Sequence, residues 1–284
     1  MTTAQLGQPV LIAADELQVE LAGDKPPVVL DVRWQLGGPP GHSEYLQGHI
    51  PGAVYVDLDT ELASRGEPAA GRHPLPDPAD FQDSMRRWGI NADSAVVVYD
   101  GEGNLSSARA WWLLRWAGHR DVRLLDGALP AWLGAGGELA TGDVRPSLGN
   151  AVVAIDETLA IDADAAASWP TVGVLLDARA AERFRGEVEP VDPVAGHIPG
   201  ASSAPTGKNL ASDGRFLSRI QLQERFGALG VDGKQPVAVY CGSGVTAAHE
   251  VAALAVAGID ARLYPGSWSQ WSNSGREVAV GDEA

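Results

Sequence analysis

"VAVYCGSGVTAAHEVAALAVAG", residues 237–258, joins four apolar residues, a glycine-rich turn and a long run of helix-forming residues. The apolar residues predict a buried strand, and we expect the helix to begin near Thr246 or Ala247. The turn holds Cys241, the only cysteine of the chain. A strand that turns directly into a helix is typical of parallel α/β sheets, in which ligands bind beyond the carboxyl ends of the strands. Cys241 is predicted to lie at one of these ends.

Four motifs of the first half of the chain recur in the same order in the second half. The pairs are VVLDVRW (28–34) with VLLDARA (174–180), GHIPGA (48–53) with GHIPGA (196–201), VVVYDGEG (96–103) with VAVYCGSG (237–244), and LLDGALPAWLGAG (124–136) with LYPGSWSQWSNSG (263–275). This order indicates a tandem duplication. We expect one domain over residues 1–140 and another over residues 150–284, joined through the glycine-rich polar stretch 134–150.

Within each half, short apolar runs alternate with helical patterns. PVVL, AVVVY and VRLL are typical of buried parallel strands, whereas PADFQDSMRRWG and ARAWWLLRWAG have helical character. Parallel strands need crossover helices between them. Each half is therefore predicted to be a small α/β domain, with a mainly parallel sheet flanked by helices on both faces.

The composition limits the partners and ligands of this chain. A net charge of -16 over 284 residues argues against a nucleic-acid partner, and an anionic substrate would need a local basic pocket. No apolar run is long enough to span a membrane, and the first residues lack a basic and then apolar leader, so we expect a cytoplasmic protein with no membrane partner. A single cysteine and six scattered histidines predict no disulfide, no metal site and no cofactor.

The turn after the strand is suited to hold an anionic sulfur. Gly242 and Gly244 permit backbone conformations that point successive N–H groups into the loop, with Val245 and Thr246 completing it. The helix start adds unpaired N–H groups and partial positive charge, which favour the thiolate. A lone cysteine is often an inert buried residue. The position of Cys241 at a strand end before a helix favours a nucleophile instead.

The first half serves as an internal control for this interpretation. Asp100 stands at the strand end that corresponds to Cys241, in the longer loop DGEGNLSSA. A carboxylate at this position would repel an anionic donor and offers no soft nucleophile. We therefore expect the first domain to be catalytically silent.

The tandem α/β halves, the two HIPGA motifs, CGSGVTA and GSWSQW together resemble the two-domain rhodanese-type sulfurtransferases. The resemblance implies two rhodanese-like domains and a double displacement. Cys241 would take the outer sulfur of thiosulfate or 3-mercaptopyruvate as a persulfide. It would then pass this sulfur to cyanide, a small thiol or thioredoxin. Without a second cysteine, only an external acceptor could discharge the persulfide.

The family pattern leaves both sulfur donors open. Gly242 and Ser243 after the cysteine match the loop that goes with 3-mercaptopyruvate, whereas two basic residues there go with thiosulfate. Arg183, in DARAAERFRG, matches the substrate-binding arginine of the family. Val191 stands where a second arginine is usual, so Arg179 or Arg185 would have to substitute for it.

The resemblance also implies a relay of Ser243, His73 and Asp59 beside the cysteine, with Trp34 lining the site. From the sequence alone, an exposed loop histidine and a surface or capping aspartate are equally good interpretations of His73 and Asp59. The repeated His49 and His197 occur in both halves, so we expect them to fix the turns rather than to catalyse. Asp31 and Asp177 are expected to orient Arg33 and Arg179, and the tryptophans to serve in packing.

Two other functions would also use a cysteine at this position. A cysteine phosphatase also cradles an anion at a helix start, but it needs an arginine six positions after the cysteine, where this chain has Ala247. A persulfide carrier without turnover, or an anion-binding regulatory module, would use the same Cys241. The carrier remains an alternative that turnover with small acceptors would exclude.

Overall fold

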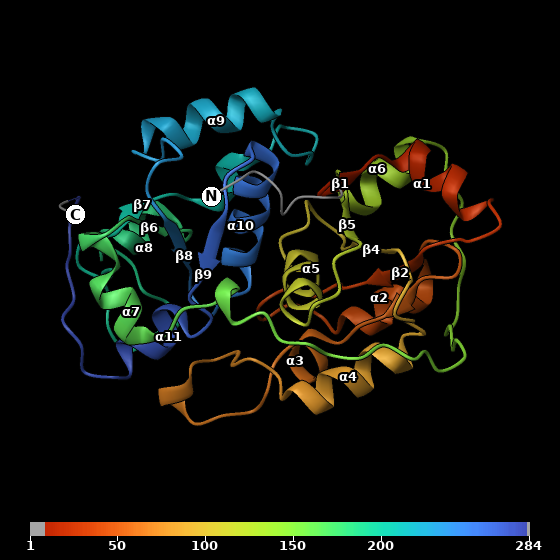
Figure 1. Ribbon diagram of the computed structural model, residues 1–284, viewed down its shortest axis with the longest axis horizontal. Coiled ribbons are helices and arrows are strands. Elements are labelled where there is room, and N and C mark those ends of the chain that lie inside the picture. The colour runs from red at the N-terminus through yellow and green to blue at the C-terminus, as the bar shows by residue number, and fades with distance from the viewer. Residues whose placement is uncertain (1–8, 283–284) are drawn as a thin grey trace. The chain divides into compact units, whose positions relative to one another are not determined.

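The computed structural model describes residues 9–282, which form two compact units (Figure 1). The first unit contains residues 9–63, Pro76–Asp156 and Ala211–Phe216, and the second contains Ser64–Leu75, Glu157–Leu210 and residues 217–282. Residues 1–8, the beginning of the segment expected to lack a leader, lie outside the described residues. Ser64–Leu75 falls within the expected domain 1–140 but makes its contacts in the second unit, so the units interleave along the sequence.

The first unit is built on a parallel sheet of five strands in the order β1-β5-β4-β2-β3. The expected apolar runs PVVL, AVVVY and VRLL supply its β2, β4 and β5. All residues of β4 are buried, as expected for a central parallel strand covered on both faces. The strands are β1 (Leu11–Ile12), β2 (Val28–Asp31), β3 (Val54–Tyr55), β4 (Val96–Tyr99) and β5 (Val122–Leu125).

Helices connect these strands and flank the sheet. The Asp77 carboxylate accepts the N–H groups of Ala79 and Asp80, and Pro78 occupies the first turn, which together explain why α4 begins there. α5 packs on β4 and β5 and is almost wholly buried. The helices are α1 (Ala14–Leu21), α2 (Gly41–Gln47), α3 (Leu58–Glu61), α4 (Pro78–Arg87), α5 (Ser107–Trp116) and α6 (Ala128–Gly134).

The second unit repeats this plan with a parallel sheet of four strands in the order β7-β6-β8-β9. Ala160 adds an isolated parallel bridge to Leu263 at the edge of β9, where the first unit has β1. Every residue of β8 is buried, and Cys241 follows it directly. The strands are β6 (Val174–Asp177), β7 (Ser202–Ser203), β8 (Val237–Tyr240) and β9 (Ala261–Leu263).

The helix after the cysteine loop, α10, begins at Thr246 as predicted and packs against β8, β9 and α9. It ends at Gly258, which adopts a left-handed conformation (φ 83°) that favours glycine. The helices are α7 (Ala163–Ser168), α8 (Ala181–Phe184), α9 (Arg219–Ala228), α10 (Thr246–Ala257) and α11 (Ser267–Ser272). The short 3-10 turns are η1 (Pro68–Ala70), η2 (Glu157–Leu159), η3 (Trp169–Thr171) and η4 (Thr206–Asn209).

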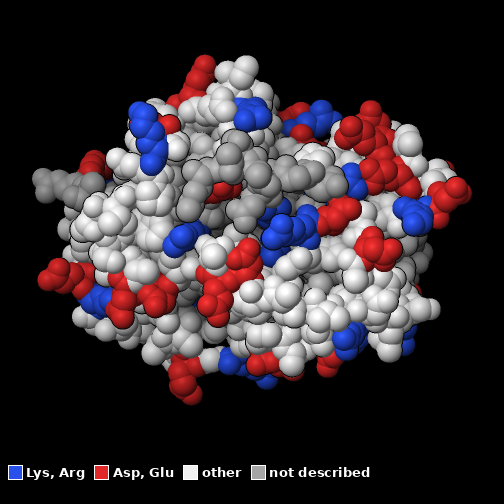
Figure 2. Space-filling model, viewed as in Figure 1, with Lys and Arg blue, Asp and Glu red and all other residues white. Residues whose placement is uncertain are grey.

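Both units thus have the predicted α/β architecture with parallel sheets between helices. Figure 2 shows acidic side chains spread over the visible face with basic ones between them, in keeping with the net charge of -16. Among residues 9–282, no helix is both long enough and apolar enough to cross a membrane.

Candidate active site

The Cys241 side chain lies inside the turn that leads from β8 to α10. The residue is only 1% exposed, and its Sγ accepts the backbone N–H of Gly244 at 3.1 Å. Gly244 has a φ of 79°, a left-handed conformation that glycine adopts at low cost. A sulfur held by a backbone donor at the start of a helix is stabilised most when it carries negative charge.

The cysteine loop is fixed from behind by α11. The Cys241 N–H donates to Ser267 Oγ at 3.1 Å, and its carbonyl oxygen accepts the N–H of Trp268 at 2.9 Å. The Gly242 carbonyl accepts the N–H of Ser269 at 2.8 Å. These bonds use N–H groups of the first turn of α11 that have no partner within the helix, so the helix start and the loop satisfy each other.

The same helix also binds the segment Ser64–Leu75. Ser269 Oγ accepts the backbone N–H of Arg72 at 3.0 Å, and Gln270 Nε2 donates to the carbonyl oxygen of Ala69 at 3.2 Å. Gly71 has a φ of 89°, and a methyl group there would lie 2.9 Å from the carbonyl oxygen of Gly266. Only glycine permits this close approach, which brings the next two residues, Arg72 and His73, to the cysteine loop.

Two members of the expected relay are in contact. His73 Nδ1 and Ser243 Oγ form a hydrogen bond of 2.7 Å, and each residue is 7% exposed. His73 is therefore not an exposed loop histidine. Asp59 lies in the first unit, where its Oδ1 accepts the indole N–H of Trp34 at 3.0 Å, and the N-cap of α3 is Asp57. The roles of Asp59 and Trp34 in the relay and at the donor stay predictions.

Two guanidinium groups lie over the cysteine loop. A methyl group placed on Gly242 would lie 3.3 Å from Arg72 Nη2 and 3.5 Å from Arg183 Nη1. Arg183 is the arginine that the sequence motif predicts. Arg72 was missed, because it stands in a loop without strand or helix period, and its only signal is its place next to His73. The cysteine loop therefore has guanidinium N–H donors beside it, of the kind that bind an anionic group.

Carboxylates hold both arginines in place. Asp192 Oδ1 accepts from Arg72 Nη1 at 2.6 Å, and Asp192 Oδ2 accepts from Arg183 Nη2 at 3.2 Å. Glu189 Oε1 accepts from Arg183 Nη2 at 2.6 Å. Burial raises the pKa of Glu189, but the hydrogen bonds from Arg183 and from the backbone N–H of Asp192 outweigh it, so the net shift is downward and Glu189 is ionised at neutral pH.

Arg179 and Arg185, the two candidates to replace the arginine missing at position 191, are engaged elsewhere. The Arg179 side chain is 1% exposed and donates to Asp177 at 2.6 Å and to the carbonyl oxygen of Gly196 at 2.6 Å. Its Nη1 also lies 3.4 Å from Glu189 Oε2, on the carboxylate that holds Arg183. Arg185 pairs with the exposed Glu187 at 2.7 Å. Arg179 thus orients with Asp177 as the repeat pattern predicts, and we infer that it supports the site without touching the donor.

In the first unit, Asp100 occupies the corresponding loop with its own carboxylate. Oδ1 accepts the N–H groups of Glu102 and Asn104, both at 2.9 Å, and Oδ2 accepts those of Ser106 and Ser107 at 2.9 and 3.1 Å. The loop of the first unit thus also directs backbone N–H groups inward, as a cradle for an anion, but here they bind the carboxylate of Asp100 itself. This arrangement supports the expectation that the first domain is silent.

The repeated histidines and aspartates have the expected structural contacts. His49 Nδ1 donates to the carbonyl oxygen of Tyr45 at 2.9 Å, and His197 Nδ1 donates to that of Phe184 at 2.7 Å. Asp31 accepts from Arg33 at 2.8 Å. Within residues 9–282, no group of three or more His, Cys, Asp or Glu side chains is arranged to hold a metal ion.

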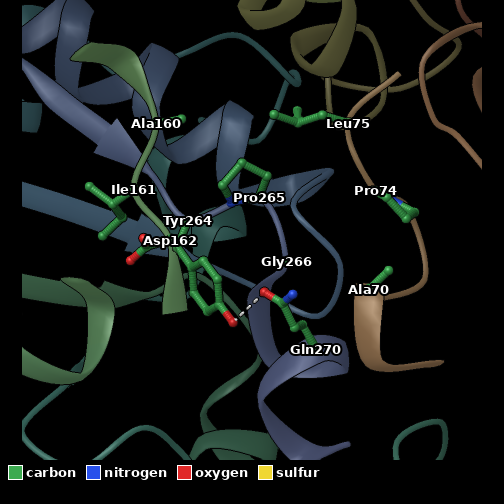
Figure 3. Close-up of a pocket in the computed structure, with 10 residues that line it drawn as sticks. All are labelled: Ala70, Pro74, Leu75, Ala160, Ile161, Asp162, Tyr264, Pro265, Gly266 and Gln270. Atoms are coloured by element: carbon green, nitrogen blue, oxygen red, sulfur yellow. Dashed lines mark hydrogen bonds between the residues drawn. The ribbon is translucent and has the colours of Figure 1, made fainter. Parts of the chain in front are cut away.

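A cavity of about 340 Å³ is lined in part by Pro74 and Leu75, the two residues that follow His73. Figure 3 shows Pro74 and Leu75 on one side of it and Ile161 and Tyr264 on the other. Tyr264 Oη donates to Gln270 Oε1 at 2.8 Å along its edge. Its lining is mainly apolar and does not include the cysteine, so we regard it as a gap in the packing beside the site.

Comparisons with known proteins agree with this geometry. The family model of the rhodanese-like domain matches residues 13–135 and 160–274. Mycobacterium tuberculosis SseB, which its name proposes as a thiosulfate sulfurtransferase, is 52% identical over 269 residues, 93% of this chain and 94% of SseB. The 3-mercaptopyruvate sulfurtransferase of Escherichia coli is 40% identical over 240 residues, 80% of this chain and 82% of that protein. The crystal structure of Escherichia coli SseA, from a report on 3-mercaptopyruvate sulfotransferases, superposes with a TM-score of 0.81 at 33% identity, over 92% of this chain and 99% of SseA. The chain belongs to the family of two-domain rhodanese-like sulfurtransferases.

Proposed function

We propose that the protein is a sulfurtransferase in which Cys241 carries the transferred sulfur as a persulfide. The observation that carries the proposal is the Cys241 sulfur itself, which accepts the Gly244 N–H at the start of α10 beneath Arg72 and Arg183. A thiolate in this position is a nucleophile, and the surrounding N–H groups and guanidinium groups favour an anionic donor beside it. Family membership supports the same reaction class.

The proposed reaction has two half-reactions. The Cys241 thiolate attacks the sulfur of 3-mercaptopyruvate, an S–S bond forms, and the C–S bond breaks with its electron pair going to the pyruvate enolate, which then takes up a proton. With thiosulfate, the S–S bond of the donor breaks and sulfite leaves. In the second half-reaction, cyanide, a small thiol or thioredoxin attacks the outer sulfur of the persulfide and releases the Cys241 thiolate.

We propose that Arg183 and Arg72 bind the anionic group of the donor. A guanidinium offers paired N–H donors that match a carboxylate or a sulfonate group. Ser243, hydrogen-bonded to His73, would contact the keto oxygen of 3-mercaptopyruvate and supply a proton as the enolate forms. This second contact favours 3-mercaptopyruvate over thiosulfate, and it does not require Asp59, whose part in the relay is still a prediction.

The relatives' names include both donors, so the donor has to be measured. The physiological acceptor and the cytoplasmic location are also predictions from the sequence. The carrier alternative predicts that the protein loads one sulfur and then fails to turn over with small acceptors. The phosphatase alternative has no support, because Ala247 is a buried residue of α10 that offers no phosphate-binding cation.

The deciding experiment is the intact mass of the protein after exposure to each donor in parallel. We expect a gain of one sulfur atom that cyanide removes, and no gain in Cys241→Ser. Ser212→Ala, an exposed change in the first unit, is the matched control and should load normally. Loading without repeated turnover would support the carrier, and failure to load with either donor would refute sulfur transfer from these substrates.

A further inference from the structure

The buried carboxylate of Asp192 lies between the two arginines that are proposed to bind the sulfur donor, and it accepts a hydrogen bond from each of them. The Asp192 side chain is 2% exposed, and its two oxygens accept from Arg72 and Arg183 separately, at 2.6 and 3.2 Å. The carboxylate therefore sets the spacing of the two guanidinium groups, which would otherwise repel each other. It stands next to Val191, the position where the family pattern has its second arginine.

The turn that presents Asp192 is itself fixed. Glu189 Oε1 accepts the backbone N–H groups of Val191 and Asp192, at 3.1 and 3.0 Å, and also bonds Arg183. The backbone of Arg72 is held independently by Ser269. Arg72 and Asp192 are thus brought together from two anchored segments, so the ion pair is built into the fold.

Apart from the Cys241 sulfur, the charges at this site cancel before any donor binds. Arg72, Arg183 and the buried Arg179 contribute three positive charges, and Asp192, Glu189 and Asp177 contribute three negative charges, with the Asp192 and Glu189 side chains 2% and 4% exposed. A Cys241 thiolate adds one further negative charge. The cysteine loop adds no cation, since Gly242, Ser243 and Gly244 are uncharged. In a partly buried site, each unit of uncompensated charge on a bound donor costs free energy.

We propose that Asp192 is a positioning residue that makes this site select donors with a single negative charge over donors with two. It holds Arg72 in the place of the arginine that is missing at position 191. Its own negative charge lets the two arginines bind one carboxylate but disfavours a donor with two negative charges. 3-Mercaptopyruvate with its thiol protonated carries one charge, whereas thiosulfate carries two. The inference rests on the proposed function and names which donor the site prefers.

The test compares Asp192→Asn with the wild type using both donors and cyanide as acceptor. Removing one negative charge beside the donor raises the ratio of kcat/KM for thiosulfate to kcat/KM for 3-mercaptopyruvate about tenfold or more. Asp192→Glu keeps the charge and leaves the ratio within about twofold. Asp232→Asn removes an equal charge from an exposed pair with Lys234 and leaves the ratio unchanged.

Equal changes for both donors in Asp192→Asn, or an Asp192→Glu ratio that moves as far as that of Asp192→Asn, would overturn the proposal. A second readout does not need turnover. In the Cys241→Ser background, Asp192→Asn should increase the stabilisation of thermal unfolding by sulfate, a dianion, more than that by nitrate, a monoanion. If the wild type transfers no sulfur but this anion preference appears, the proposed function fails while the role of Asp192 stands. Equal responses to the two anions would contradict that role.

Discussion

Replacing Asp100 by asparagine tests the energetics of the filled cradle in the first unit. Two effects oppose each other there: burial disfavours the carboxylate, and four backbone N–H donors favour it. Burial is the larger effect and raises the pKa of Asp100 from 3.8 to about 6. A difference of this size corresponds to about 3 kcal/mol between the protonated and ionised forms.

The sign of the pH dependence follows from this pKa. Between about pH 4 and pH 6 the folded protein retains a proton that the unfolded chain has released, so the free energy of unfolding falls as the pH rises. The contribution of Asp100 is therefore complete below about pH 4 and is lost by about pH 6. Asp100→Asn has no charge to titrate. The wild type should lose about 3 kcal/mol relative to the variant across this range.

Urea unfolding at several pH values measures this difference. Tryptophan fluorescence follows the unfolding mainly of the first unit, which holds six of the nine tryptophans. Three of these six, Trp111, Trp112 and Trp116, lie on α5, directly after the Asp100 loop. Other titrating groups are common to both proteins and cancel in the comparison. Asp24→Asn, at an exposed position, is the control and should follow the wild type. A difference between wild type and Asp100→Asn that stays constant would show that the N–H donors balance burial, and one that grows in favour of the wild type as the pH rises would show that they outweigh it; either result contradicts the prediction.

Three further changes have defined outcomes. Gly242→Ala puts a methyl group against the two guanidinium groups and should lower kcat/KM for either donor about tenfold with little change in melting temperature; unchanged kinetics would place the donor elsewhere. Burial lowers the pKa of His119, so wild-type stability should decline as the pH falls below about 6.5, whereas His119→Gln should resist this decline in thermal unfolding; parallel curves would argue against the shift. Asn209→Ala removes the amide that donates to Glu250 at 2.6 Å inside the second unit. Burial raises the pKa of Glu250 to about 7. Loss of the hydrogen bond from Asn209 should lower the free energy of unfolding in urea by about 2 kcal/mol, and a decrease below about 0.5 kcal/mol would contradict this prediction.

The features that sequence predicted well are those with a local or repeated pattern. Apolar runs located β2, β4 and β5, and the glycine-bracketed turn placed the start of α10 near Thr246 or Ala247, where the structure has it at Thr246. The pairing of Asp177 with Arg179 was predictable because the two residues are two positions apart on the chain and recur as Asp31 and Arg33. Such contacts depend on short-range geometry that the chain repeats in both halves.

The features that sequence missed depend on contacts between distant residues. Arg72 and Asp192 are 120 positions apart and meet only because α11 holds one segment and Glu189 fixes the other. Neither residue has a periodic neighbourhood that predicts where it lies. The same holds for the filling of the first cradle, where a loop longer than its counterpart lets four N–H groups reach the Asp100 carboxylate.

The interleaving of the two units has a consequence for dividing the chain. The sequence repeat suggests that cutting the chain within 134–150 would give two complete domains. A fragment that starts at residue 150 would keep Cys241 but lose Ser64–Leu75, the piece of the second unit that is encoded between β3 and β4. Such a fragment would lack the histidine and the arginine that this segment places at its cysteine loop. The duplication has produced two similar folds, but the second half of the chain, expressed alone, would not contain a complete site.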